Sequence, residues 1–269
     1  MTTRSLSATE LASRRAPAFG GLNAIALSIE IRRLLRNRRT LIFTMIMPSI
    51  FFLLFGLNSA YANDSNGKGA YGNVSAFVLI SMALYGATLA TTSGGAMVSI
   101  ERAAGWSRQL RLTPLASPAY VGLKMLTSLV LGLGSVAAVF IVGGVTGKPS
   151  MPVWLWVVSA LCVWVGSLVF AAFGLFLGYL LPTENVMQFL GFIMMLFSFG
   201  GGVFIPLSQY PHVLRDIAEY TPLYGLNQLV HAPLLNSGVD IAWVGNAIAW
   251  LIIFTAGAAW RFRKDTARV

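Results

Sequence analysis

Six long stretches of the chain lack Asp, Glu, Lys and Arg, and short polar segments separate them. The stretches cover residues 40–63, 69–100, 125–147, 149–183, 185–214 and 241–260. About 20 apolar residues in a helix cross a hydrocarbon core of about 30 Å, so each stretch is long enough to span a membrane. The fourth is too short for two spans and a turn, and we interpret it as one long helix. Residues 220–239 contain Pro222 and Pro233 and make a poor seventh span.

The composition is typical of a polytopic membrane protein. Of the 269 residues, 56% are hydrophobic and only 10% are charged, and the mean hydropathy is +0.72. Soluble domains carry about 25% charged residues, and one soluble core cannot enclose this much apolar surface. The same apolar content excludes disorder for most of the chain. We therefore expect an all-α membrane protein with six transmembrane helices.

The positions of the basic residues predict the orientation. Eight of the nineteen precede residue 40, four lie between residues 102 and 124, and four follow residue 260. Only Lys68, Lys148 and Arg215 fall on the other side. Cytoplasmic segments carry the excess of Lys and Arg, so both termini are predicted to be cytoplasmic, which requires an even number of spans. The net charge of +10 then reflects topology, and we expect no nucleic-acid partner.

Several motifs that would indicate an enzyme are missing. The sequence has no H-E-x-x-H zinc motif, no G-x-S-x-G nucleophile turn and no cluster of Cys and His. We therefore expect no catalytic residues, no metal and no cofactor in this chain. Ion-coupled transporters keep ionisable groups near the membrane midplane, and the six stretches contain no Asp, Glu, Lys or Arg, which disfavours ion coupling. Sodium sites built from backbone and hydroxyl groups stay open as an alternative.

The loop at residues 99–120 is the only sizeable inner segment between spans. Read as a helix, it places Ile100 and Ala103 on a weakly apolar face, while Glu101 and Arg102 project elsewhere. A short stiff helix of mixed charge suits force transmission from a soluble partner. A simple topological anchor needs the same charges, so the residues alone leave both interpretations open.

A second inner segment, residues 22–39, alternates apolar residues with arginines. We expect an amphipathic elbow helix at the inner membrane surface, with its arginines on lipid phosphates. Those interfacial residues are Arg32, Arg33, Arg36, Arg38 and Arg39. Contact with a soluble partner is the alternative. Residues 1–21 are expected to form a disordered cytoplasmic tail.

Three features resemble the membrane subunits of ABC-2 type transporters. The inner loop carries Glu101-Arg102-x-x-Gly105, then Leu110-Arg111-x-Thr113-Pro114-Leu115, Tyr120 and Lys124. The elbow helix and Pro48 in the first span fit the start of that family's membrane domain. The outer segment at residues 203–240, which follows two glycines, is similar to its re-entrant stretch between spans five and six. The resemblance covers residues 22–264 and leaves 265–269 as a C-terminal tail.

This resemblance implies an ATP-driven exporter with several subunits. Two permease chains, as a homodimer or with a sister chain, would assemble with two copies of a separate ATPase that binds ATP and Mg. The inner loop would be the coupling helix seated on the ATPase. The coupling residues implied are Glu101, Arg102, Gly105, Leu110, Arg111 and Pro114. The family also implies a bacterial cytoplasmic membrane and a role in drug or antibiotic efflux and resistance.

Uncharged spans disfavour a highly charged cargo, so we expect a hydrophobic or amphipathic drug, antibiotic or lipid. The cavity candidates are Met194, Met195, Phe197, Phe199 and Phe204, since Met and Phe adapt to varied ligands. The same side chains also suit lipid contact or helix packing. The alternatives are export of a lipid-linked polysaccharide by an ABC-2 transporter, and an ion-coupled secondary transporter without an ATPase. Gly174 and Gly178 form a close-packing pair, within one chain or across a dimer.

Overall fold

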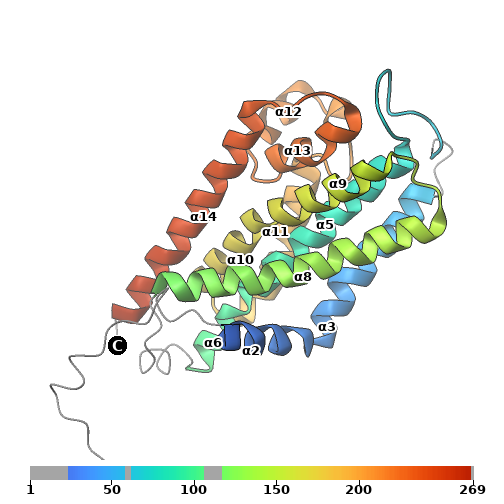
Figure 1. Ribbon diagram of the computed structural model, residues 1–269. Helices are drawn as coiled ribbons and strands as arrows, with labels where there is room; N and C mark the ends of the chain where they lie inside the picture. Colours follow the sequence, from blue (N-terminus) through green and yellow to red (C-terminus); the bar gives the residue numbers. More distant parts are fainter. Residues whose placement is uncertain (1–23, 58–61, 106–116, 268–269) are drawn as a thin grey trace, which may run out of the picture.

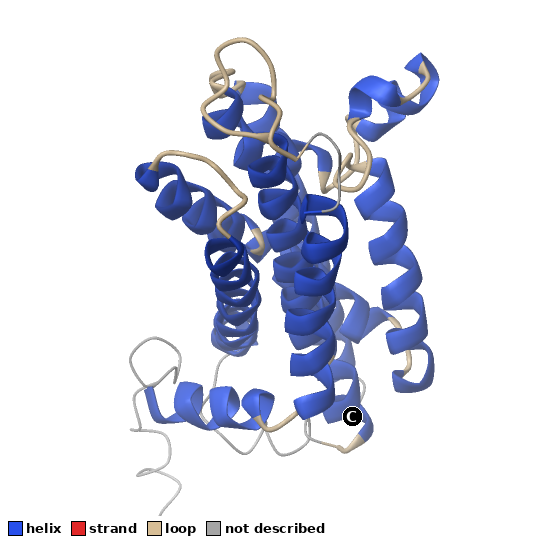
Figure 2. Cartoon of the chain, turned by 90° about the vertical axis from the view of Figure 1, so that its right-hand side faces the viewer, coloured by secondary structure: helices blue, strands red, loops and turns tan. Residues whose placement is uncertain are grey.

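The computed structural model describes residues 24–57, 62–105 and 117–267. Within these ranges the regular structure is helical, with one isolated bridge between Ser65 and Asn73 (Figure 2). Among the described residues, four helical segments are long and apolar enough to cross a membrane: Val74–Ala103, Ala119–Thr146, Val153–Leu180 and Ile241–Lys264. Two shorter apolar helices, Ile42–Gly56 and Gln188–Gly200, lie in the first and fifth predicted stretches. The all-α membrane fold is confirmed, and crossing by all six stretches stays a prediction.

The elbow helix α2 (Ala24–Leu35) lies across one end of the bundle, and α3 (Arg38–Leu41) turns away from it (Figure 1). The elbow therefore ends short of residue 39. The first span continues through the wide π-helical turns η2 (Ile42–Ile46) and η3 (Phe52–Gly56), with α4 (Met47–Phe51) between them. These wide turns flank Pro48, which cannot donate a backbone hydrogen bond.

The central helix α5 (Val74–Ala96) begins at Asn73, whose side chain accepts a hydrogen bond from the Ala76 amide at 3.0 Å. Most of its residues are buried on all sides, as expected for a helix with no polar face. After Met97 the chain continues as α6 (Val98–Ala103).

Helix α8 (Ser117–Thr146) returns along α5, and α9 (Val153–Gly166) and α10 (Leu168–Leu180) follow. Because only Ser167 separates the last two, the fourth stretch is one long helix, as predicted. Close contact between α5 and α10 depends on glycines. A Cβ on Gly95 would lie 2.6 Å from the Ala171 carbonyl oxygen, and one on Gly174 would overlap the Thr92 carbonyl. The Gly174 pair thus packs helices within one chain.

The fifth stretch forms α11 (Thr183–Gly200). The segment after it contains the short turn η4 (Leu207–Gln209), the exposed α12 (His212–Ala218) and α13 (Tyr224–Leu235). Helix α13 is largely buried against α5, α9 and α14 (Ile241–Ala267), and it ends at Asn236 in a left-handed conformation. A buried short helix is consistent with the predicted re-entrant character of residues 203–240.

The two ends of the bundle differ in charge. Helices α2 and α6 and the C-terminal end of α14 lie together at one end, which we call the basic end (Figure 1). Helices α12 and α13 lie at the opposite end, which we call the α13 end. Arg32, Arg33 and Lys264 are at the basic end, where the charge pattern predicts the cytoplasm.

Candidate functional site

A buried group of charged side chains lies at the basic end. The Nζ atom of Lys124 donates hydrogen bonds to Glu101 Oε1 at 2.6 Å and to Glu30 Oε2 at 2.7 Å. Arg33 donates to Glu101 Oε1 at 2.9 Å, and the Tyr120 hydroxyl donates to Glu101 Oε2 at 2.6 Å. We call these five residues the ionic joint. It connects three elements, α2, α6 and α8.

The ionic joint is balanced in charge and closed to solvent at its centre. The side chains of Glu101 and Lys124 are each only 4% exposed. The joint contains two carboxylates, Glu30 and Glu101, and two cations, Arg33 and Lys124. Burying a charge is costly unless it is paired and hydrogen-bonded. The joint therefore links α6 to the elbow and α8, and loss of one charged member would leave the buried charges unbalanced.

Arg102 ties α6 to a further helix. Its guanidinium donates to the carbonyl oxygens of Gly178 at 3.0 Å and Tyr179 at 2.9 Å, near the end of α10. Carbonyls in the last turn of a helix have no partner within it and attract cations. The guanidinium also lies 5.6 Å from the Tyr179 ring centroid. Through Glu101 and Arg102 together, α6 contacts the elbow, α8 and α10.

On α6 the acidic side chain faces the protein and the apolar side chains face outward. Ile100 is 38% exposed and Ala103 is exposed, whereas Glu101 is only 3% exposed. The sequence alone did not predict this burial, because the charges that receive Glu101 come from α2 and α8. The helix ends at Ala103, and Gly105 follows with φ +76°. Glycine adopts this left-handed conformation without strain.

Three predicted coupling residues, Leu110, Arg111 and Pro114, lie outside the described residues. The start of α8 at Ser117 also places the end of the predicted loop inside a helix. Tyr120 and Lys124 are thus helical and buried.

The outer face of the elbow carries apolar and basic side chains side by side. Ile25 and Ile29 are exposed, at 72% and 60%, while Glu30 and Leu34 face the protein. A hollow of about 360 Å³ is lined by Ile29, Arg32, Arg33 and Arg36. Arg38 is exposed at the start of α3, and the side chain of Arg39 is outside the described part. Exposed isoleucines beside arginines suit a membrane interface, and contact of these residues with lipid stays a prediction.

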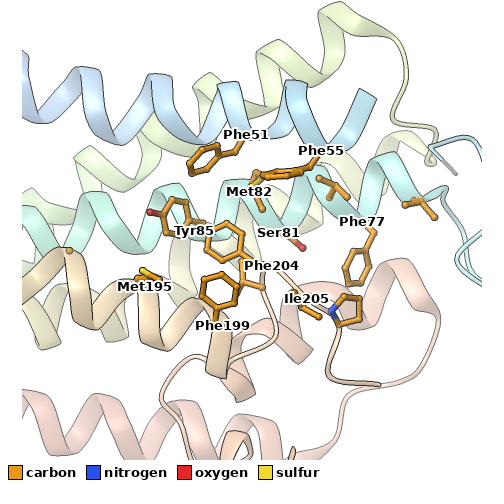
Figure 3. A pocket seen from close by; sticks show the side chains of 15 residues that line it. Phe51, Phe55, Phe77, Ser81, Met82, Tyr85, Met195, Phe199, Phe204 and Ile205 are labelled. Carbon is orange, nitrogen blue, oxygen red and sulfur yellow. The ribbon is translucent and has the colours of Figure 1, made fainter. Parts of the chain in front are cut away.

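A second candidate site is an apolar cavity of about 750 Å³. It lies between the first span, α5, α11 and the loop after α11 (Figure 3). Its lining consists of Phe51, Phe55, Val74, Phe77, Val78, Ser81, Met82, Tyr85, Gly191, Met195, Phe199, Val203, Phe204, Ile205 and Pro206. Because the lining includes the first residue of α5 and the loop leading to α12, the cavity lies toward the α13 end.

Phe204 is at the centre of the aromatic wall of this cavity. Its ring centroid lies 5.1 Å from that of Tyr85, 5.2 Å from Phe199 and 6.3 Å from Phe51. Aromatic pairs at these separations attract each other beyond their area burial. Phe204 therefore connects the first span, α5 and α11 around the space. Cavities of this size and character hold drug-sized apolar ligands.

Three of the five cavity candidates line the space: Met195, Phe199 and Phe204. The other two do not. Met194 is 1% exposed and its sulfur accepts a hydrogen bond from Thr92 at 3.6 Å. Phe197 packs against Phe173, with ring centroids 5.4 Å apart. Met194 and Phe197 lie on a different face of α11 from Met195. Their side chains pack α11 against α5 and α10.

Sequence reasoning missed most of both sites. Glu30 is the one acid among the arginines of the elbow, and this was the only local signal for the joint. Phe77, Ser81 and Tyr85 recur at four-residue spacing and therefore share one face of α5. The sequence therefore shows that these three residues share a face of α5, but it does not show that the first span lies opposite that face.

Comparisons with known proteins identify the family of the chain. The family model for ABC-2 type transporters matches residues 23–234. The chain belongs to this family. It is 27% identical over 198 residues to YvfS of Bacillus subtilis (strain 168), which is named as a candidate transport permease; the match covers 72% of this chain and 78% of YvfS. An ABC-2 family member is a membrane transport component, and the family in general works with an ATPase partner.

Proposed function

We propose that this chain is the permease subunit of an ATP-driven exporter in a bacterial cytoplasmic membrane. A separate ATPase, present in two copies, would bind ATP and Mg, and a second permease chain would complete the membrane pore. The cargo would be a hydrophobic or amphipathic compound, such as a drug, antibiotic or lipid. The apolar, uncharged cavity between the first span, α5 and α11 supports this cargo class.

The observation that carries the proposal is the connection of α6 to three other elements. Glu101 bonds to the elbow and to α8, and Arg102 bonds to the end of α10. A partner that pushes on the segment after α6 would therefore move several helices as one unit. Glu101 and Arg102 would act as positioning residues inside the chain, and the exposed residues that follow would contact the ATPase.

The test is ATP-dependent transport in proteoliposomes that contain the full chain and its co-purifying ATPase. The probe is Nile red, an uncharged fluorescent amphiphile. We expect its movement to need ATP and to stop with vanadate. An ion gradient alone would drive it only if the chain were a secondary transporter.

A matched pair of glycine variants tests the coupling step. Gly105 and Gly238 both have positive φ, at +76° and +74°, and both have open space where a Cβ would lie. Valine is strained at either position. Gly105→Val, at the basic end, should abolish most of the ATP-driven movement with normal membrane insertion, while Gly238→Val, before α14, should leave it intact. Equal effects of the two variants would contradict a coupling role for α6.

A further inference from the structure

The cavity contains one side-chain hydroxyl that is bonded to another element. Ser81 on α5 lines the cavity (Figure 3). Its Oγ lies 3.1 Å from Nε2 of His231 on α13. Other hydroxyls of α5 behave differently: Thr88 and Thr91 donate to carbonyls of their own helix. The Ser81 hydroxyl is therefore directed by a residue 150 positions away.

The distances around His231 indicate which ring nitrogen carries the proton. Nδ1 lies 2.8 Å from the Asn227 carbonyl oxygen, and Nε2 lies 3.3 Å from the Phe77 carbonyl oxygen. Two unprotonated acceptors would repel each other at 2.8 Å, so the proton belongs on Nδ1 and is donated to Asn227. The groups around the ring, namely the two carbonyls and the Ser81 hydroxyl, are uncharged and the ring is buried, which favours neutral imidazole.

With its proton on Nδ1, the imidazole can only accept at Nε2. The Ser81 hydroxyl then donates its one proton to His231, and the oxygen keeps only acceptor capacity for a molecule in the cavity. The Phe77 ring is also part of the lining. Its centroid lies 4.1 Å from that of the imidazole, so the two rings pack against each other.

Helix α13 also supports the opposite wall. The side chain of Asn227 donates to the Gly201 carbonyl oxygen at 3.0 Å. Gly201 directly precedes the loop that places Val203 and Phe204 in the cavity. The same helix thus fixes the hydroxyl and the aromatic wall that faces it.

We propose that Ser81, oriented by His231, is a hydrogen-bond acceptor that selects cavity ligands with an uncharged donor group on an apolar body. The chemical class is an aromatic or aliphatic alcohol, phenol or N–H compound. This inference rests on the proposed function of the cavity and adds its polarity requirement.

Three probes of similar shape test the direction of the hydrogen bond: 2-naphthol (a donor), 2-methylnaphthalene (apolar) and 2-methoxynaphthalene (acceptor only). Equilibrium binding of each radiolabelled probe is measured on the full chain with its accompanying subunits in lipid nanodiscs, with empty nanodiscs subtracted. A Tyr85→Phe background removes the other hydroxyl of the lining. We expect 2-naphthol to bind about fivefold more tightly than the other two, as one neutral hydrogen bond gives.

Two variants complete the test. Ser81→Ala should abolish the preference for 2-naphthol and leave 2-methylnaphthalene unchanged. Ser198→Ala is the control, because Ser198 is buried and donates to Met194 away from the cavity. A preference for 2-methoxynaphthalene, or a naphthol preference that survives Ser81→Ala, would overturn the proposal.

A further variant distinguishes failure of the cavity as a binding site from failure of the Ser81 inference. Gly191 lines the cavity and has open space where a Cβ would lie, so Gly191→Phe should fill it and weaken all three probes. If Gly191→Phe changes none of them, the cavity is not the binding site and the proposed function loses its cargo site. If it weakens all three but no donor preference exists, only the Ser81 inference fails.

Discussion

Lys124 is the residue that holds the two carboxylates of the ionic joint together. It bonds to both Glu30 and Glu101, which come from different helices. Without it, two carboxylates would share a site with only Arg33, whose side chain is 42% exposed. An uncompensated buried charge is among the most destabilising changes known.

Lys124→Met should therefore lower the free energy of unfolding by about 3–5 kcal/mol. The measurement is the melting temperature of the purified chain in detergent, with the exposed Lys148→Met as the control. Adding Glu101→Gln to Lys124→Met should recover part of the loss, because it removes one of the unpaired charges. Equal melting temperatures for the Lys124→Met and Lys148→Met chains would contradict the assignment of Lys124 as a buried, paired lysine.

At the scale of elements, the contact between α5 and α10 depends on backbone approach. A Cβ on Gly174 would overlap the carbonyl group of Thr92, and a helix backbone cannot move aside as a flexible side chain can. Gly174→Ala should destabilise the chain by about 1–3 kcal/mol. Gly144→Ala is the matched control, since Gly144 is also helical and has open space around it. Equal melting temperatures for the two variants would count against the close packing.

Much of the fold could be predicted from the sequence, because apolar runs and basic segments are local signals. The long helix at Val153–Leu180 and the elbow were expected from such patterns. The inward direction of Glu101 was not, since its partners are Glu30, Arg33 and Lys124, and their meeting depends on how three helices pack. Only a small part of the cavity was predicted for the same reason: Met195 was identified on α11, but the facing Phe51 is set by tertiary packing.

At the scale of the whole molecule, charge and architecture together predict sidedness. Lys68 lies in the exposed loop before α5, and Arg36 is exposed at the end of the elbow. Cys162 is the single cysteine, so Cys162→Ala provides a background without thiols. In intact cells a membrane-impermeant maleimide should label Lys68→Cys and leave Arg36→Cys unlabelled until lysis. The reverse pattern would place the basic end outside.

The ATPase partner is the central claim, because the proposed role of α6 has no meaning without it. The most direct measurement is purification of the tagged full chain from its native membrane in mild detergent, with partners identified by mass spectrometry. We predict a stoichiometric ABC ATPase that is lost when residues 106–115 are replaced by Gly and Ser, with insertion and melting temperature unchanged. A clean preparation that lacks any ATPase, even after cross-linking, would contradict the account and favour transport driven by an ion gradient.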